Sequence, residues 1–452
     1  MLRYFKAAAA AVGFFAIPAV SSILTQSGPL TLEQCIAMAL ESNVSIEVAN
    51  ERIAEKTLAV KEASTANKPK LSAQAVYTRL GEATTVSGVV GASPIMNDNG
   101  FYSAIPFELD LGKNVYNVGV TLTQPIYTGG KITAAKQIAG YGLSASEWQR
   151  KATVREVKRD VTKAYYNILA ARKSLVALDS AISMMEVLTK DLSNAVEVGM
   201  RGEHELLQAQ VQLLNQRLSR QQASSGATAA ADYLSTLIGH PVNSDLDLVK
   251  EIEHPETLDR SVPDLTALQA RARDASADLK ALEEQVSIIE TSAKIAGATR
   301  IPTVALQAGY SGQGTSFEKD YWNNGFNASL IAQWDFYDWG AASQKKSQAL
   351  SQKRQLELSM ENLRTMIDMQ VKNTMISLED AFASIETSQK NIEQSKRSYE
   401  ISYDRFQEGA LLSSELLTAQ NSILQAEISY YAALSNFYAK LADMDYLVKL
   451  DD

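Results

Sequence analysis

The chain contains the same arrangement of residues twice. Residues in the middle of the sequence recur 210 positions later, Tyr127 and Gly130 as Tyr337 and Gly340, and the segment 205–210 as 415–420. Before Tyr127 the offset is 233, so that residues 32, 69 and 77 correspond to 265, 302 and 310, and the first copy carries 23 extra residues between 77 and 116. Two copies of one unit predict a molecule shaped by internal symmetry, in which an active site of unique residues is the less natural expectation.

The N-terminal residues 1–22 are typical of a secretory signal. Arg3 and Lys6 precede an apolar stretch over 7–20, and residues 19–21 form a small-x-small cleavage site. The stretch is shorter than the ~20 apolar residues of a membrane-spanning helix, and an uncleaved N-terminal anchor is the alternative. The remaining chain divides into a first repeat over 23–240 with a β-hairpin at 70–127, a linker over 241–262, and a second repeat over 263–450 with a β-hairpin at 302–338.

Composition excludes several classes of function. Cys35 is the single cysteine of 452 residues, which rules out an intramolecular disulfide framework and a multi-cysteine metal site. Its amphipathic surroundings indicate a packed thiol. The formal net charge of −9 argues against nucleic acid as a partner.

Catalytic motifs are present only in incomplete form. The segment 204–208 resembles a zinc-protease helix, but Gln208 stands where the second histidine is required. The segment 309–313 lacks the final glycine of a nucleophile elbow. The chain is therefore predicted not to be an enzyme, and no metal or other cofactor is expected.

Long helices dominate the predicted structure, which is mainly α with a small β part. Apolar residues spaced by three and four from Val154 to Met185 form a coiled-coil seam in a proline-free segment, 131–198. At 1.5 Å per residue, such a helix spans roughly 100 Å. The second copy has the same plan over 341–407. Shorter helices are expected over 31–66, with Thr31 as N-cap, and over 263–298. The seams are predicted to lack enough partners within the chain to bury them, and an ordinary intramolecular bundle is the alternative.

Four segments alternate apolar with polar or small residues: 71–80, 116–123, 302–312 and 326–336. They approach the ~9–11 residues of a membrane-crossing strand, and aromatic residues near their ends resemble an interfacial girdle, namely Tyr116, Tyr310, Tyr321, Trp322, Phe326 and Trp334. A small soluble sheet is the alternative. Four strands cannot close a membrane barrel, so several chains would have to share one. The intervening residues 81–113 are predicted to be a long loop, of which 82–112 would face the cell surface.

The order of these elements resembles the TolC family of outer-membrane efflux proteins over essentially the whole mature chain. The motifs are 32–43 (Leu-x4-Ala-x-Ala-Leu-x2-Asn), 124–130 (Gln-Pro-Ile-Tyr-x-Gly-Gly) and two Gly-x5-Glu-Leu-Leu-x-Ala turns. The resemblance implies a homotrimer with a shared transmembrane β-barrel, four strands per chain, above a long α-helical barrel in the periplasm. It also implies passive export in multidrug efflux or type I secretion, with a periplasmic adaptor and an inner-membrane transporter as partners.

The resemblance also implies functional positions at the two helix-turn-helix tips. The periplasmic aperture would involve Glu415, Glu205, Leu411 and Thr418. The tip turns, which would contact the adaptor, contain Gly199, Arg201, Gly202, Gly409 and Leu412. Leu411 and Phe406 replace the arginine and tyrosine of the family's polar lock, so closure must use other contacts, with Arg201 and His204 as candidates. The barrel-to-helix junction comprises Pro125, Gly129, Gly130 and Gly340.

Other interpretations remain open at this level. Both glutamates could be solvated charges at helix N-termini, where they would interact with the helix dipole. A periplasmic coiled-coil adaptor or scaffold without a pore is the alternative function, although two tandem copies with strand pairs favour the channel. The sequence does not identify the transported substrate.

Overall fold

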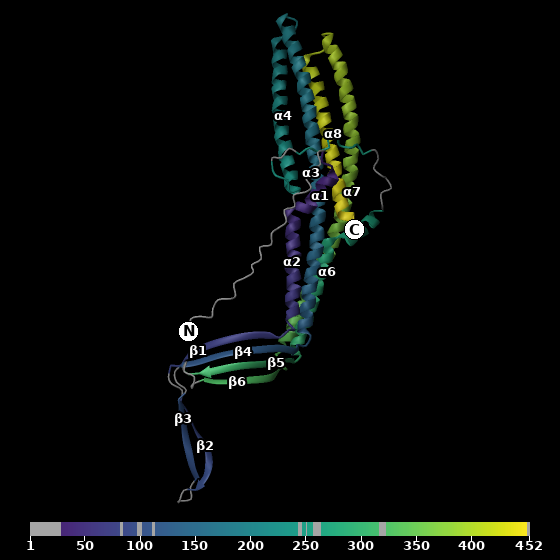
Figure 1. Ribbon diagram of the computed structural model, residues 1–452. Coiled ribbons are helices and arrows are strands. Elements are labelled where there is room, and N and C mark those ends of the chain that lie inside the picture. The colour runs from purple at the N-terminus through teal and green to yellow at the C-terminus, as the bar shows by residue number, and fades with distance from the viewer. Residues whose placement is uncertain are drawn as a thin grey trace.

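The computed structural model describes residues 29–81, 85–96, 102–110, 114–242, 246–249, 251–255, 264–315 and 322–449. The predicted signal segment lies outside this range. The described chain is an elongated rod with helices along most of its length and a small sheet at one end (Figure 1). No helix in these ranges combines the length and hydrophobicity needed to cross a membrane.

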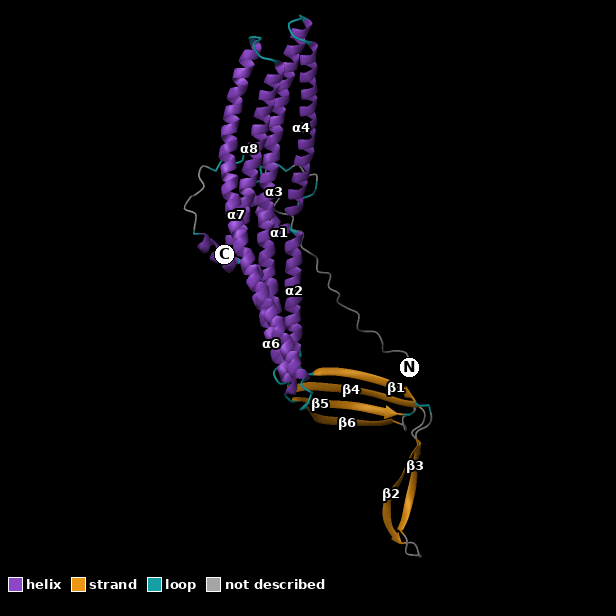
Figure 2. Ribbon diagram, turned by 180° about the vertical axis from the view of Figure 1, so that it is seen from behind, coloured by secondary structure: helices purple, strands orange, loops and turns teal. Residues whose placement is uncertain are grey.

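Four long helices lie side by side in one half of the rod, in the order α4, α3, α8 and α7 (Figures 1 and 2). Their bounds are Lys131–Glu197 for α3, Glu203–Leu237 for α4, Ala341–Gln407 for α7 and Ser413–Val448 for α8. α3 and α7 contain 67 residues each, as expected for proline-free heptad segments. They continue towards the sheet, where shorter helices pack beside them.

The predicted helix over 31–66 is two helices, α1 (Leu32–Ser42) and α2 (Val44–Thr65). Asn43 between them is extended, at φ −72° and ψ 124°; its side chain accepts a hydrogen bond from the Ser45 N–H and donates one to the Leu237 carbonyl. Because an asparagine can cap the following helix, it can end one helix and begin another. The prediction of Thr31 as N-cap is confirmed, and Gln34 completes a capping box.

The predicted helix over 263–298 is divided in the same way, into α5 (Leu265–Ala275) and α6 (Ala277–Gly297). Ser276 separates them, and its hydroxyl accepts a hydrogen bond from the Leu279 N–H. A short 3₁₀ turn, η1 (Ala298–Arg300), then leads into the sheet. The two breaks occur at the same point of each repeat, where a small polar residue interrupts a helical pattern.

The sheet has the order β1, β4, β5, β6, and all neighbouring strands are antiparallel. The bounds are Lys70–Arg79 for β1, Asn114–Tyr127 for β4, Thr303–Gly314 for β5 and Trp322–Gln333 for β6. β6 was predicted to reach 336 but ends at Gln333, which pairs with Thr303, the first residue of β5. Pro302 precedes Thr303 and has no N–H with which to extend the ladder.

The predicted loop over 81–113 contains a separate hairpin instead. β2 (Thr85–Met96) and β3 (Tyr102–Asp110) pair with each other and extend away from the four-stranded sheet (Figure 1). The sequence analysis gave weight to glycine, serine and asparagine in this segment, whereas valine, isoleucine and phenylalanine at paired positions favour strands. The two edges of the main sheet are therefore β1 and β6.

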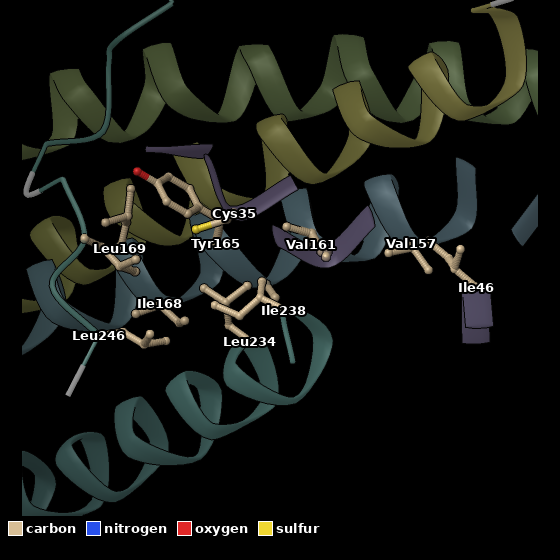
Figure 3. Close-up of a cluster of buried hydrophobic side chains, with 13 residues drawn as sticks. Cys35, Ile46, Val157, Val161, Tyr165, Ile168, Leu169, Leu234, Ile238 and Leu246 are labelled. Carbon is tan, nitrogen blue, oxygen red and sulfur yellow. The ribbon is translucent and has the colours of Figure 1, made fainter. Parts of the chain in front are cut away.

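The largest core cluster lies at mid-height of the rod, where α1, α3 and the end of α4 meet (Figure 1), and its side chains are shown in Figure 3. Cys35, Val161, Ile168 and Leu234 are completely buried there, and burial raises the pKa of the Cys35 thiol to about 11, with a smaller contribution from Glu33.

The helix seams do have partners within the chain, contrary to the sequence-based expectation. Val157 and Val161 of α3 and Val371 and Ile385 of α7 are at most 5% exposed in the single chain. Many apolar residues that stay exposed lie on the outer helices of the row, α4 and α7, although Val176 and Val187 of the inner helix α3 are exposed as well. The α4 set is Leu207, Val211, Leu214 and Leu218, each more than half exposed, and the α7 set includes Met366, Met369 and Ile376.

Candidate functional site at the helix tips

The two helix-turn-helix tips have the same backbone geometry. Gly199 after α3 and Gly409 after α7 adopt left-handed φ values of 77° and 76°. In each turn, the next residue donates a backbone hydrogen bond to the carbonyl five positions earlier, Met200 to Ala195 at 2.8 Å and Ala410 to Arg405 at 2.9 Å. This is the pattern of a glycine-terminated helix, in which other residues would be strained at the glycine position.

Arg201 connects the first tip to the second. Its guanidinium donates hydrogen bonds to the carbonyls of Leu411, at 3.4 Å, and Phe406, at 3.3 Å. The same group lies 4.7 Å from the centre of the Phe406 ring, a cation–π distance. The side chain is only 17% exposed. Arg201 therefore makes three contacts to the end of α7 and the turn that follows it.

The two candidate aperture glutamates have different surroundings. Glu205 is buried, and its carboxylate lies 3.4 Å from the Arg201 guanidinium. Arg201 therefore pairs with this carboxylate and also donates hydrogen bonds to the second tip. Glu415 is exposed in the first turn of α8, and within the described residues no ion pair involves it. Of these two repeat-equivalent carboxylates, that of Glu205 is paired with an arginine, whereas that of Glu415 is exposed and has no ion-pair partner among the described residues.

A hydrophobic cluster fixes the tips beneath these polar contacts. Leu188, Leu192, Leu213 and Leu416 are buried together, and Leu206, Tyr403, Phe406 and Leu411 pack against them. All four long helices contribute to the cluster. Leu411 and Phe406, which replace the polar lock residues implied by the family resemblance, thus contribute apolar contacts and two carbonyl acceptors.

A polar layer lies further along the same helices, and the sequence analysis did not identify it. Gln212 of α4 donates to the Asn421 side chain of α8 at 2.9 Å, and the buried Gln216 approaches the same oxygen at 3.4 Å. Gln420, 2% exposed, donates to the Ala181 carbonyl of α3 at 3.0 Å. The signal in the sequence would have been amides at buried positions of an apolar helix pattern.

The remaining tip positions are mostly exposed. Leu412 is 59% exposed as the N-cap residue of α8, and the Thr418 hydroxyl donates to the Ser414 carbonyl at 2.8 Å. A Cβ at Gly202 would lie 2.8 Å from Nδ1 of His204, so a side chain there would displace the histidine. His204 makes no contact in the described structure that would support its predicted part in closure.

The junction residues lie where the strands turn into the long helices. Pro125 is in β4 next to a register shift in its pairing with β5. Gly130 and Gly340 are the N-cap residues of α3 and α7, both left-handed. Gly129 is also left-handed, and a Cβ there would lie 2.9 Å from the Ile301 Cβ, so this position requires glycine.

The described residues contain no group of three or more histidine, cysteine, aspartate or glutamate side chains that could hold a metal ion. At this end of the four-helix rod, two glycine turns are joined by the side chain of Arg201. Such an arrangement can hold or release a helix end, and its exposed carboxylate can attract cations.

A family model described as "Outer membrane efflux protein" matches residues 35–240 and 268–446 of the chain. Protein CyaE of Bordetella pertussis is 25% identical over 315 residues, which cover 68% of this chain and 65% of that relative. The fold is similar to the crystal structure of the Campylobacter jejuni CmeC outer membrane channel, with a TM-score of 0.74, 18% identity and coverage of 92% and 85% of the two chains. The open state of the Neisseria gonorrhoeae MtrE outer membrane channel gives a TM-score of 0.68 at 19% identity, covering 92% and 88%.

Proposed function

The chain belongs to the outer membrane efflux protein family, and we propose that it is a channel-tunnel through which pump and adaptor complexes export substrates across the periplasm and the outer membrane. The family consists of transport channels and is not an enzyme class. Similar solved structures are outer membrane channels of Gram-negative bacteria. Multidrug efflux and type I secretion are the two processes that this function would serve.

The observation that carries the proposal is that the single chain is open at both lateral edges. β1 and β6 end the sheet, and an unpaired strand edge is not tolerated in lipid. α4 and α7 end the row of helices, and both keep apolar residues exposed. Further copies of the chain would pair β1 with β6 and α4 with α7, closing both layers around one axis in a homotrimer.

The apolar and polar faces of the sheet fit this arrangement. Leu71, Leu122, Leu306 and Leu330 share one face and are exposed in the single chain. The opposite face carries Ser72, Thr121, Asn327 and other small or polar residues, with Val76 and Ile331 among the apolar exceptions. In a membrane barrel the apolar face meets lipid and the polar face lines the lumen.

The helix tips would form the periplasmic mouth. Arg201 would hold the two tips of one chain together in the closed entrance, and opening would require its contacts with Phe406 and Leu411 to break. Three copies of Glu415 would then face one axis and concentrate negative charge at the aperture, with Thr418 one helical turn further along α8. Glu205, already paired with Arg201, would contribute less to that charge.

Partners would bind at the same end. A periplasmic adaptor would contact the tip turns, including Gly199, Gly202, Gly409 and Leu412, and an inner-membrane transporter would supply the substrate. The exposed turn residues Met200 and Leu412, 78% and 59% exposed, offer apolar contacts for such a docking partner.

Planar-bilayer recording of the purified protein tests the proposed function. A channel-tunnel should produce discrete conductance steps, small when the entrance is closed. A well-folded protein that inserts without any conductance would contradict the proposal.

A further inference from the structure

A cavity of about 450 Å³ lies where α1, α3 and the end of α8 meet, and most of the charged groups in its wall are cations. Four basic side chains line it against one carboxylate, that of Asp445, in a chain whose net charge is −9. The four are Arg155, Lys158, Arg159 and Lys449. Because α3 and α8 are the inner helices of the row, the cavity is formed within one chain.

Three of these cations share one face of α3. Arg155, Lys158 and Arg159 are spaced by three and four residues, and all three are half-buried. Like charges at this spacing destabilise a helix. Glu156 and Asp160 lie 3.2 and 2.8 Å from the Arg159 guanidinium and offset its charge. With both counted, cations still outnumber carboxylates, and such a wall favours an anion.

The cations have different parts in the structure. Arg155 donates hydrogen bonds to the carbonyl of Ala275, at 2.6 Å, and to that of Lys449, which lie at the ends of α5 and α8. It therefore stabilises two helix ends. Lys158 carries an ammonium on a flexible four-carbon chain, which can turn towards a ligand. Among the cations of the wall, Lys158 is the one best suited to bind an anion.

The second repeat indicates that the fold does not require these residues. α7 pairs with α8 as α3 pairs with α4, yet the residues equivalent to the three α3 cations are Thr365, Asp368 and Met369. The positions of α4 that correspond to Tyr438 and Tyr446 of α8 hold Thr228 and Thr236. The basic and aromatic wall is thus an addition to the repeated plan, made at one site.

Tyrosines complete the wall. The rings of Tyr166 and Tyr438 stack with centroids 3.9 Å apart, and the Arg159 guanidinium lies 4.8 Å from the centre of the Tyr446 ring. Tyr438 donates to the Glu253 carbonyl at 2.9 Å. In the part of the chain that the structure describes, the hydroxyls of Tyr166 and Tyr446 make no hydrogen bond. Burial raises the pKa of both phenols, so they stay protonated and can donate.

The rest of the cavity is apolar. Leu32 and Ile36 of α1 line one side, and Leu441 of α8 lines another. A few polar donors in an otherwise apolar cavity are typical of a site for a small organic ligand. A phosphate group has three acceptor oxygens, one for each of an ammonium and two phenols, whereas a carboxylate has two.

We propose that this cavity binds an organic phosphate, with Lys158 and the hydroxyls of Tyr166 and Tyr446 holding the phosphate group and the leucine and isoleucine side chains holding an apolar or aromatic body. A bound phosphate would join α1, α3 and α8. The site lies within one chain and does not depend on the proposed channel.

Isothermal titration calorimetry tests the site on the purified full-length chain in detergent, with protein-free micelles as the blank. Phenyl phosphate is the probe. Benzoate has the same ring with a carboxylate, inorganic phosphate lacks the ring, and benzamide lacks the charge. Phenyl phosphate should bind, benzoate and inorganic phosphate more weakly, and benzamide not at all. Absence of phenyl phosphate binding by folded protein would overturn the proposal, and equal affinity for benzoate would overturn the assignment to phosphate.

A lipid headgroup and a water-soluble ester are two sources of the same chemistry. Dihexanoyl phosphatidic acid, used below its own micelle concentration, separates them. Binding tighter than that of phenyl phosphate would assign a lipid, and weaker binding would assign a soluble ester. Either result supports recognition of the phosphate group.

Two variants test the proposed donors. Lys158→Gln should weaken phenyl phosphate binding about 10-fold, and Tyr446→Phe about 3- to 10-fold, as expected for the loss of one hydrogen bond to a charged group. Tyr446→Phe keeps the ring that contacts Arg159, so the variant should fold. The matched controls are Lys390→Gln and Tyr399→Phe, both on α7 and outside the cavity. Equal affinity in all four variants would overturn the assignment.

Thermal unfolding provides a second measurement. Without ligand, Tyr446→Phe should melt at the temperature of the natural chain. Phenyl phosphate should raise the melting temperature of the natural chain, because a ligand that binds only the folded state stabilises it. The increase should be smaller in Lys158→Gln. An equal increase in both proteins would be an effect of ionic strength and would contradict the site.

Discussion

Arg201 donates a hydrogen bond to the carbonyl of Leu411, the residue that occupies its own position in the second repeat. The family resemblance implied an arginine at position 411, where this chain has leucine. The cation stands at the equivalent place of the other tip and reaches across to the turn that lacks it. The two tips are therefore joined by a contact between repeat-equivalent residues, with the arginine in the first tip at position 201 and not in the second tip at position 411.

Replacement of Arg201 by alanine should loosen the tips. The change removes two hydrogen bonds and leaves the buried Glu205 without its cation. A loss of roughly 2 kcal/mol in the closed arrangement would raise the open-to-closed ratio about 30-fold. Single-channel recording should show more frequent or larger openings, and global melting should change little because the tip is a local unit.

Arg217→Ala is the matched control; this arginine lies in α4, further from the tip than Arg201. Arg217 pairs with Glu186 of α3 at 2.6 Å, with both side chains about half exposed, and it does not reach the second tip. Exposed pairs contribute ~0–1 kcal/mol, so conductance should not change. Equal behaviour of the two variants would contradict the assignment of Arg201. Arg201→Lys should restore little, because an ammonium cannot donate in the same forked geometry.

Glu415→Gln should lower cation selectivity without affecting assembly. In the proposed trimer, three Glu415 carboxylates would face one axis and attract cations, and a loss of ~0.5–1 kcal/mol of this attraction corresponds to about a 2- to 5-fold change in permeability ratio. Block by multivalent cations should weaken in parallel. The measurement is reversal potential in a salt gradient across a planar bilayer.

The Glu205→Gln variant distinguishes the role of Glu205 from that of Glu415. Its carboxylate is buried against Arg201, so selectivity should change less than in Glu415→Gln, while closure should weaken. If Glu415→Gln trimers kept their selectivity and block, that glutamate would be only a helix-end charge.

The Cys35 thiol should be unreactive in the folded protein. It is fully buried and its pKa is about 11, against 9.0 for a free thiol, so almost no thiolate exists at neutral pH. Maleimide labelling should therefore require denaturant. Because folding favours the protonated thiol, its contribution to stability is present below pH 9.0 and is lost as pH rises towards 11. Rapid labelling of native protein at pH 7 would show that the packing is wrong.

Much of the fold could be predicted because its determinants are local. Heptad spacing and the absence of proline predicted the long helices, and α7 runs over the predicted residues 341–407. The family and the fold class are confirmed, and the family match decides for the channel over the adaptor. The division into repeats at 23–240 and 263–450, and the roles of the tip and junction residues, remain predictions.

The features that the sequence analysis did not predict depend on contacts between residues far apart in the chain. Asn43 ends α1 because its side chain also reaches the Leu237 carbonyl, and this contact is not visible in the local helical pattern. Glu205 matches Glu415 in sequence, but one is buried and the other exposed because of an arginine that also bonds the opposite turn. Repeat symmetry predicts equivalent backbones, whereas packing between the repeats determines how each side chain is used.

The β2–β3 hairpin should project from the cell surface. It lies between β1 and β4, at the end of the sheet opposite the long helices (Figure 1). Asn97, between the two strands, lies outside the described residues. An epitope tag inserted near it should be tolerated and detected by antibody on intact cells. Detection only after the outer membrane is opened would mean that the topology is inverted.

The mass of the purified protein in detergent tests the shared channel most directly, because one chain leaves both β1 and β6 unpaired. Light scattering corrected for bound detergent should give three times the mass of the mature chain. A folded monomer as the dominant species would contradict a barrel and a helical tunnel built from several chains.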